Sequence, residues 1–446
     1  MGNYIQTFVI KDYSACRLNR DRFGNIKHMS VGGVDRMVFS SWSLLWAMRK
    51  YMELDEIRVA DIPELIEAMA DQYVEDGILL PEAREHAVEA LVSVFYKDSS
   101  SKPSKNKKAK KETAGAGEES DDTEEKKKEK GKTVIFSNVD ELHEIFETVF
   151  NSSVEITTAL NMAAGETDKK KREDLVKKTV ARISDKAKEA VNKIPISVAK
   201  AMLGMMATEG AFFTIYSAVQ VSHSYGLDRY EPMSNDWAAN PVIRYRNPGS
   251  STRDPFYSGL EKFARDQAGK KGADNIQSQE NASSTMYTYG SVEPCLFRDN
   301  LKLRSTEKVS EDEISGAVGE YTAKFVESLA LVEPDGGQTR NASHTAPAIV
   351  YIEKIRNGQN RGLDNNKPIE YDRFRNKSIC EQGIERILRF AKDRAFRKAE
   401  ITAYAWLSGE YADDYEKEFE KAGVIIIHNI EEMAEFVSRD AVDLLS

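Results

Sequence analysis

The side chains best suited to chemistry in this chain are the cations of its first fifty residues, which together could bind a polyanion. Residues 11–50 hold eight Lys or Arg and three Asp, a local net charge of +5 in a chain of net charge −10. A local basic surface on an acidic protein points to a specific polyanion site rather than to non-specific attraction. Arg suits paired hydrogen bonds to phosphate, and Lys suits a point-charge contact. The eight cations are Lys11, Arg17, Arg20, Arg22, Lys27, Arg36, Arg49 and Lys50.

A strand, a loop and a second strand must position most of these cations. Residues 4–10 are rich in β-branched and aromatic side chains and predict a buried strand. Residues 19–33 predict a polar loop that ends in a glycine pair, and residues 36–39 predict a second short strand. Ser40 or Ser41 then stands where the N-cap of a helix belongs.

The helix that follows is predicted over residues 42–50. Trp42 and Trp46 recur on it at a helical spacing, and we expect both to belong to the core rather than to a platform for nucleic-acid bases. Arg49 and Lys50 close its last turn, where cations suit the helix dipole. The basic segment can therefore also be interpreted as a solvated strand–helix unit without a ligand.

Signatures of enzymes and metal sites are absent from the sequence. It holds no complete Gly-x-x-x-x-Gly-Lys-Ser/Thr loop, no Gly-x-Gly-x-x-Gly and no Gly-x-Ser-x-Gly. The three cysteines, Cys16, Cys295 and Cys380, lie far apart, which excludes a disulfide framework and a four-thiolate zinc site and fits a reducing cytosol. The six histidines are scattered singly, and no apolar run reaches transmembrane length. We therefore expect a non-enzymatic, cytoplasmic binding protein without metal or cofactor.

Two segments of unusual composition divide the chain. Residues 101–132 hold eleven Lys and eight Asp or Glu with almost no apolar side chain, so we predict a disordered insertion. Residues 212–222 and 285–297 predict a pair of strands separated by about sixty irregular residues, and such a long projection is more often functional or mobile. Within it, residues 241–275 form a second locally basic zone of net charge +3.

The remaining pattern predicts an α+β core with helical additions, because strands are interleaved with helices. Helices are expected over 61–75, 81–96, 139–150, 166–193, 196–207, 311–332, 377–397 and 430–438, and further strands over 348–353, 401–406 and 424–427.

Several of these motifs together resemble a known family. The run from Cys16 to Asp21, the pair Gly32-Gly33, residues 36–41 and residues 47–50 are similar to the opening of the backbone subunit of the type I-E CRISPR surveillance complex, Cascade. That subunit is repeated along the guide RNA. Further similarity is scattered over most of the chain, at 201–206, 209–211, 236–237, 338–350 and 357–359.

The resemblance implies a right-hand-like architecture. A ferredoxin-like (RRM-like) palm would come from 1–59, 201–223 and 285–446, which includes the C-terminal helices. Helical fingers would be inserted at 60–200 and carry the charged insertion, and 224–284 would form a long thumb.

The resemblance also implies a function. Copies of the chain would stack as a helical homo-oligomer on the CRISPR RNA (crRNA), beside other Cascade subunits, and present the guide for pairing with a target DNA strand. The implied RNA-binding residues are Arg17, Arg20, Lys27, Ser40, Ser41, Arg49, Lys50, Arg244, Arg246 and Gln338. Met233 and Trp237 would act as the thumb wedge that displaces a base.

Some positions differ from the family pattern and keep two alternatives open. Trp42, Leu45 and Trp46 replace polar or cationic residues of the serine motif, and Met205 stands where the family often has Arg. A degenerate assembly scaffold that no longer binds RNA is one alternative. The other is a divalent-metal-dependent nuclease that cuts target RNA with a thumb Asp, for which Asp228 and Asp236 are the candidates.

Overall fold

The computed structural model describes residues 2–54, 57–59, 62–95, 135–137, 139–205, 214–239, 259, 262, 275–304, 309–363, 365–393, 397 and 399–446. The predicted insertion at 101–132 lies outside these residues. The chain forms two compact units. We call Met1–Met52, Val221–Ser291 and Thr322–Val437 the sheet unit, and Glu53–Gln220, Val292–Tyr321 and Ser438–Ser446 the helical unit.

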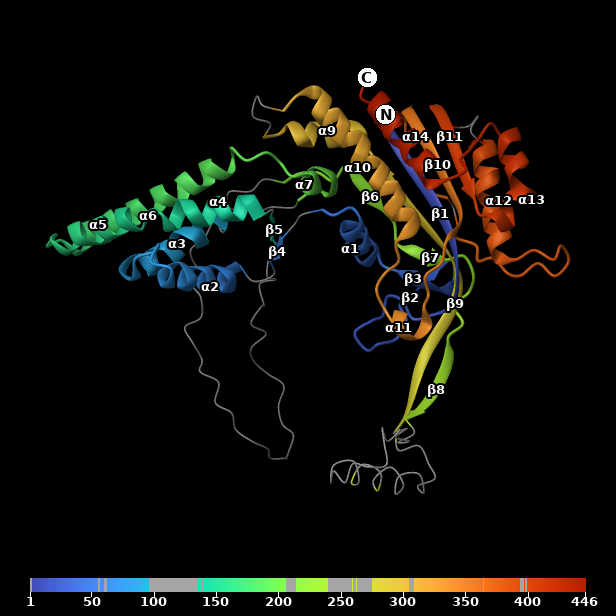
Figure 1. Ribbon diagram of the computed structural model, residues 1–446, viewed down its shortest axis with the longest axis horizontal. Helices are drawn as coiled ribbons and strands as arrows, with labels where there is room; N and C mark the ends of the chain where they lie inside the picture. The colour runs from blue at the N-terminus through green and yellow to red at the C-terminus, as the bar shows by residue number, and fades with distance from the viewer. Residues whose placement is uncertain are drawn as a thin grey trace, which may run out of the picture. The chain divides into compact units, whose positions relative to one another are not determined.

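A mostly antiparallel sheet, ten-stranded within the described residues, organises the sheet unit (Figure 1). Its main strand order is β12-β11-β10-β1-β9-β7-β3-β2, and β6 and β8 also pair with β9. The strands are β1 (Gly2–Cys16), β2 (His28–Val31), β3 (Val34–Phe39), β6 (Val219–Val221), β7 (Ser224–Gly226), β8 (Met233–Ala239), β9 (Asn275–Val292), β10 (Pro347–Gly358), β11 (Glu400–Leu407) and β12 (Ile425–Ile426). The prediction of a mixed α+β fold is confirmed.

The central position of β1 follows from its apolar run. Ile5, Phe8, Val9 and Ile10 are all buried, and successive side chains of a strand point to opposite faces, so both faces of β1 are covered. The strand extends beyond the predicted residues 4–10. Its antiparallel pairing with β10 runs from Gly2 to Lys11, and β9 is its neighbour on the other side.

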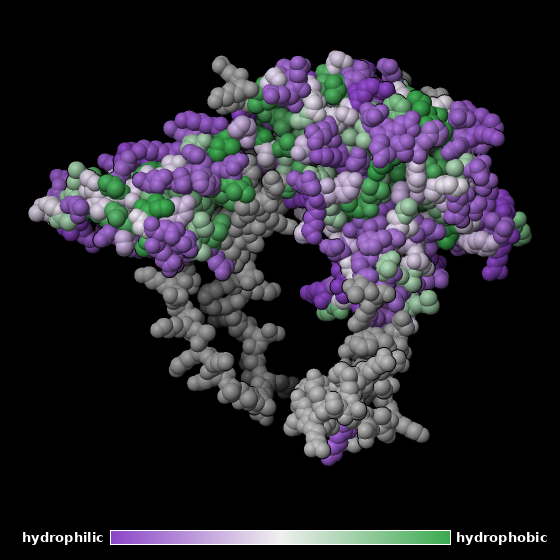
Figure 2. All heavy atoms as spheres, viewed as in Figure 1, coloured by the Kyte–Doolittle hydropathy of each residue, from purple (hydrophilic) through white to green (hydrophobic). Residues whose placement is uncertain are grey.

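Helices complete the sheet unit. They are α1 (Ser41–Tyr51), α11 (Gln338–Asn341), α12 (Ile379–Lys392), α13 (Gly409–Lys421) and most of α14 (Ile430–Asp443), with the second half of α10 (Glu311–Leu331). Helix α12 begins at a capping box between Ser378 and Glu381, and its buried side chains Ile384 and Ile387 join Phe8 of β1 in one core cluster. Figure 2 shows mostly hydrophilic side chains on the visible surface over α12 and α13.

Several buried polar side chains meet at Glu353 of β10. This carboxylate is fully buried and accepts hydrogen bonds from Gln6 Nε2 (2.6 Å), the Tyr351 hydroxyl (2.6 Å) and Arg397 Nη2 (2.7 Å). The arrangement satisfies a charge that would be costly to bury alone.

The helical unit contains a short two-stranded sheet and a group of helices. Its elements are β4 (Ile57–Val59), α2 (Ile62–Glu75), the 3₁₀ helix η1 (Pro81–Ala83), α3 (Arg84–Phe95), β5 (Ile135–Ser137), α4 (Val139–Phe150), α5 (Ser153–Ala164), α6 (Lys169–Val191), α7 (Val198–Leu203), α9 (Pro294–Lys302) and the first half of α10. Among the described residues, no helix has the length and apolar composition needed to cross a membrane.

A buried charge cluster joins three parts of the helical unit. Glu141 of α4 is fully buried and pairs with Lys200 of α7, which is 1% exposed. Arg304, which follows α9, donates to Glu141 Oε1 (2.9 Å) and to the Val191 carbonyl (3.2 Å). One carboxylate therefore compensates two buried cations.

Two strand predictions were wrong at their ends. Of the described residues in 212–222, only Val219–Val221 lie in a strand. The prediction of a strand over 285–297 fails after Val292, because Pro294 begins α9. Proline lacks the N–H that a ladder needs and favours the first turn of a helix. The loop predicted over 19–33 contains β2, which pairs with β3 across the two-residue turn Gly32-Gly33.

The expected core positions of Trp42 and Trp46 were also wrong. Helix α1 extends one residue beyond each end of the predicted helix, but Leu44 and Met48 form its buried face. Trp42 is 74% exposed and Trp46 is 49% exposed. Two apolar stripes with the same four-residue spacing compete on this helix, and the sequence period alone does not distinguish them.

Candidate nucleic-acid interface

The loop between β1 and β2, residues 17–27, carries Arg17 and Arg20 and is held in shape by its own hydrogen bonds. Asp21 Oδ1 accepts from the backbone N–H of Phe23 (2.8 Å) and of Asn25 (2.9 Å). Arg17 Nη2 donates to the Gly24 carbonyl at 2.8 Å. Because this guanidinium closes the loop, Arg17 contributes to loop shape in the structure.

Arg20 and Lys27 lie at the two sides of this loop. Arg20 is exposed and forms an isolated bridge with Ile26, while Lys27 is half-buried. The Lys27 backbone N–H donates to the Asn19 carbonyl at 3.2 Å. The backbone at both predicted cations is therefore fixed by pairing between the two sides of the loop.

The start of α1 is tied to this loop. Asn19 has a left-handed backbone (φ +50°), and its Nδ2 donates to Ser40 Oγ at 3.2 Å. The Ser41 N–H donates to His223 Nδ1 at 2.9 Å, so that ring nitrogen carries no proton. The first N–H groups of a helix have no acceptor within the helix, and here an imidazole nitrogen accepts the hydrogen bond of one of them. Neither Asn19 nor His223 had been assigned a contact from the sequence.

Gly336 and Gly337 lie against the same loop. Their φ values are +152° and +62°, and a Cβ on Gly336 would lie 2.9 Å from the Arg17 carbonyl oxygen. Gln338 follows this pair, and its side-chain Oε1 accepts from the Ser343 N–H at 2.7 Å. The predicted RNA-binding side chain of Gln338 is therefore engaged in its own turn.

The last turn of α1 holds the other two predicted cations. Arg49 is half-buried and Lys50 is exposed. Lys50 Nζ lies 4.3 Å from the centroid of the Trp46 ring and 3.8 Å from Asp335 Oδ2. The exposed ion pair has little energetic weight.

Arg36, by contrast, is a structural residue. It is fully buried, and its guanidinium donates to the backbone carbonyls of Asn365 (2.7 Å), Asn366 (2.6 Å) and Gly226 (3.4 Å). Burial lowers its pKa. Lys11 is also buried, at 5% exposed, so two of the eight cations of the basic segment are directed into the protein.

We expect replacement of Arg36 by methionine to lower the free energy of unfolding by about 3 kcal/mol, because several buried carbonyls would lose their donor. Urea unfolding of the full chain measures the effect. Arg22→Met, at an exposed position of the same segment, is the control and should change stability by less than about 0.5 kcal/mol. Equal stability of the two variants would contradict the structural role of Arg36.

The predicted thumb range contains a long ribbon. Strands β8 and β9 pair from Met233↔Asn281 to Ala239↔Asn275, and Figure 1 shows this ribbon running away from the rest of the sheet. Met233 is 69% exposed. Trp237 lies in β8, but its side chain and the residues Arg244 and Arg246 fall outside the described part of the chain.

The carboxylates of the nuclease alternative are only partly described. Asp228 accepts a hydrogen bond from the Ser284 hydroxyl, and burial raises its pKa. The side chain of Asp236 lies outside the description. Within the described residues, no three His, Cys, Asp or Glu side chains are grouped so that they could hold a metal ion.

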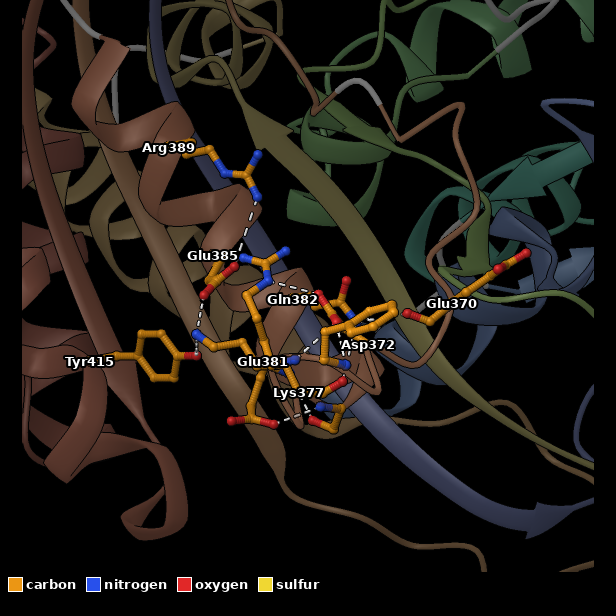
Figure 3. Close-up of polar contacts among 11 residues, drawn as sticks. Glu370, Asp372, Lys377, Glu381, Gln382, Glu385, Arg389 and Tyr415 are labelled. Carbon is orange, nitrogen blue, oxygen red and sulfur yellow. Dashed lines mark hydrogen bonds and ion pairs between the residues drawn. The ribbon is translucent and has the colours of Figure 1, made fainter.

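An open groove of about 560 Å³ lies elsewhere in the sheet unit, between α12 and α13. Figure 3 shows that its charges face one another: Lys377 pairs with Glu385, which Arg389 also approaches at 3.9 Å. Lys377 Nζ lies 3.4 Å from the Tyr415 hydroxyl. Because these charges compensate each other and none belongs to the predicted polyanion site, we place the candidate interface at the loop and α1 instead.

Comparison with solved structures finds the same fold in two related assemblies. A chain of a "CRISPR RNA-guided surveillance complex, pre-nicking" matches with a TM-score of 0.63 and 14% identity, covering 98% of this chain and 100% of that one. A chain of a "CRISPR RNA-guided surveillance complex" matches with a TM-score of 0.59 and 14% identity, covering 98% and 99%. The search of the curated proteins found no match. The family model for the CT1975-like protein (Cas_CT1975) matches residues 5–237 and 255–431, and the chain therefore belongs to that family.

Proposed function

We propose that this protein is the guide-RNA-binding backbone subunit of a type I-E CRISPR surveillance complex. In this role, copies of the chain stack along the crRNA and present it for pairing with target DNA. Full-length similarity to chains of CRISPR surveillance complexes supports a CRISPR-associated role. The observation that carries the RNA-binding assignment is the pre-folded loop with Arg20 and Lys27, hydrogen-bonded through Asn19 to the start of α1.

In this proposal the loop contacts the sugar–phosphate backbone. Arg20 and Lys27 bind phosphates, and such contacts fix the register of the strand without reading its sequence. Ser40 Oγ accepts from Asn19, which leaves its own O–H able to donate to a phosphate oxygen. The sequence is read by base pairing of the guide with DNA.

The architecture of the proposal follows the family. The sheet unit would contain the ferredoxin-like palm, the inserted helices would form the fingers, and the β8–β9 ribbon would form the base of the thumb. Met233, exposed on that ribbon, is the wedge candidate that the structure describes.

We expect Arg20→Ala and Lys27→Ala each to weaken binding of a short single-stranded RNA. Each lost phosphate contact should reduce the slope of log affinity against log salt by about 0.7, and the double variant should lose about twice that amount. Fluorescence anisotropy at several salt concentrations measures the slope. Lys392→Ala, which removes an exposed cation of the α12–α13 groove, is the matched control. Slopes that match wild type in Arg20→Ala, Lys27→Ala and their double variant would contradict the assignment.

Co-expression with the other subunits and a CRISPR array tests the function as a whole. The proposal expects a large particle that carries RNA of one guide length through size exclusion. An RNA-free assembly or a monomer would overturn it and favour the scaffold alternative.

A further inference from the structure

The solvent face of α1 carries an aromatic stripe, which we define as Trp42, Trp46 and Lys50. Residues four apart lie on one side of a helix, and the buried residues Leu44 and Met48 lie on the opposite side. Trp42 is 74% exposed and Trp46 is 49% exposed. Isolated exposed aromatics are common, but two indoles in one row form a surface that a ligand could cover.

Cations accompany exposed rings at two places in the basic segment. Lys50 Nζ lies 4.3 Å from the Trp46 ring centroid, and the Arg22 guanidinium lies 4.7 Å from that of Phe23, which is 74% exposed. Rings beside cations are typical of single-strand nucleic-acid sites, where bases stack on the rings and the cations follow the phosphates.

The stripe begins where the cationic loop is attached. Trp42 directly follows Ser41, whose N–H is held by His223, and Ser40, which is held by Asn19. The loop is therefore hydrogen-bonded to the chain two residues before Trp42, the first ring of the stripe. A strand bound through phosphates at Arg20 and Lys27 would pass close to Trp42.

Asp335 limits how much charge the stripe can offer, because it lies 3.8 Å from Lys50. Binding at the stripe should therefore depend on stacking more than on ion pairing. This chemistry favours a nucleic-acid base over a second acidic protein surface, and it differs from the phosphate contacts of the loop.

We infer that Trp42 and Trp46 form a base-stacking platform for single-stranded RNA, beside the phosphate-binding loop. This inference rests on the proposed RNA-binding function and adds a second kind of contact to it. Stacking is tolerant of sequence because every base has a π-face, so the platform would hold any guide.

The test compares two RNA probes on the full chain, expressed without a CRISPR array. One probe is a short oligouridylate, and the other is an abasic ribose-phosphate strand of equal length. The wild type should prefer the oligouridylate. Trp42→Ala and Trp46→Ala should each weaken its binding by about 5- to 100-fold with little change in salt slope, and the double variant should bind both probes equally.

Matched variants separate stacking from folding. Trp42→Phe and Trp46→Phe keep a ring and should retain most of the preference for the oligouridylate. Phe374→Ala removes a fully exposed ring at another place in the sheet unit and should behave like the wild type. The wild-type comparison of the two probes needs no variant and therefore does not depend on how well any variant folds.

Three results would overturn the inference. The first is equal affinity of the wild type for both probes, and the second is a preference for the oligouridylate that persists in the double alanine variant. The third is loss of self-assembly in the alanine variants with unchanged RNA binding, which would make the stripe a protein contact. In each of these cases a reduced salt slope in Arg20→Ala would still support the proposed function. A chain that binds no RNA at all would instead overturn the proposed function itself.

Discussion

Replacing Glu141 with alanine should lower the free energy of unfolding of the helical unit by about 3–5 kcal/mol. The substitution leaves Lys200 and Arg304 as cations that are 1% and 8% exposed without their shared carboxylate. Removing one partner of a buried ion pair costs far more than the pair contributes, because the remaining charge stays desolvated. Two such charges remain here, so we expect partial loss of the helical unit at room temperature.

Urea unfolding followed by far-UV circular dichroism measures the change. Glu155→Ala is the matched control in the same unit, because Glu155 pairs with Arg182 (2.9 Å) and Lys186 (2.9 Å) at the surface. Exposed pairs contribute less than about 1 kcal/mol. A Glu141→Ala variant as stable as Glu155→Ala would show that the cluster is not a major source of stability.

Replacing Glu353 with alanine should destabilise the sheet unit by a similar amount, about 3–5 kcal/mol. Arg397, whose side chain is 9% exposed, would lose both of its carboxylate contacts, and Gln6 and Tyr351 would lose their acceptor. Because Glu353 lies on β10 beside the central strand β1, the loss should spread to the pairing of these two strands.

Hydrogen exchange of the β1 and β10 amides measures this effect locally, together with the unfolding midpoint. Glu400→Ala, at an exposed position of β11, is the control. A second variant, Glu353→Leu with Arg397→Met, removes the whole pair and should recover most of the stability. If the single and double variants were equally unstable, the cost would come from packing rather than from an unpaired charge.

The predictions from sequence succeeded where the pattern was local. The apolar run of residues 4–10 and the serines before α1 each report on neighbouring residues, and the corresponding elements are present. The two-residue Gly32-Gly33 turn was a usable hairpin signal, because positive φ at both central positions suits such turns. It was interpreted as the end of a loop, and β2 was missed.

The predictions were limited where contacts are distant in sequence. Nothing near Glu141 indicates that Lys200 and Arg304 will meet it, and nothing near Arg36 indicates that backbone carbonyls of 365–366 will enclose it. Counting charges therefore included two buried cations, Lys11 and Arg36, in the basic segment. The exposed face of α1 was also assigned wrongly, because Trp42 and Trp46 have the same spacing as Leu44 and Met48.

The order in which the sheet can form follows from the position of β1. Its two neighbours in the sheet are β9 and β10, and Val9 pairs with Val350. A ribosome adds roughly 5–20 residues per second, so the roughly 340 residues between these partners take about 20–70 s to make. Until β9 begins at Asn275 the apolar strand has neither neighbour, and β10 follows only at Pro347, while most of the helical unit is already synthesised. We expect nascent chains of this protein to need protection of their first sixteen residues until the second half has emerged.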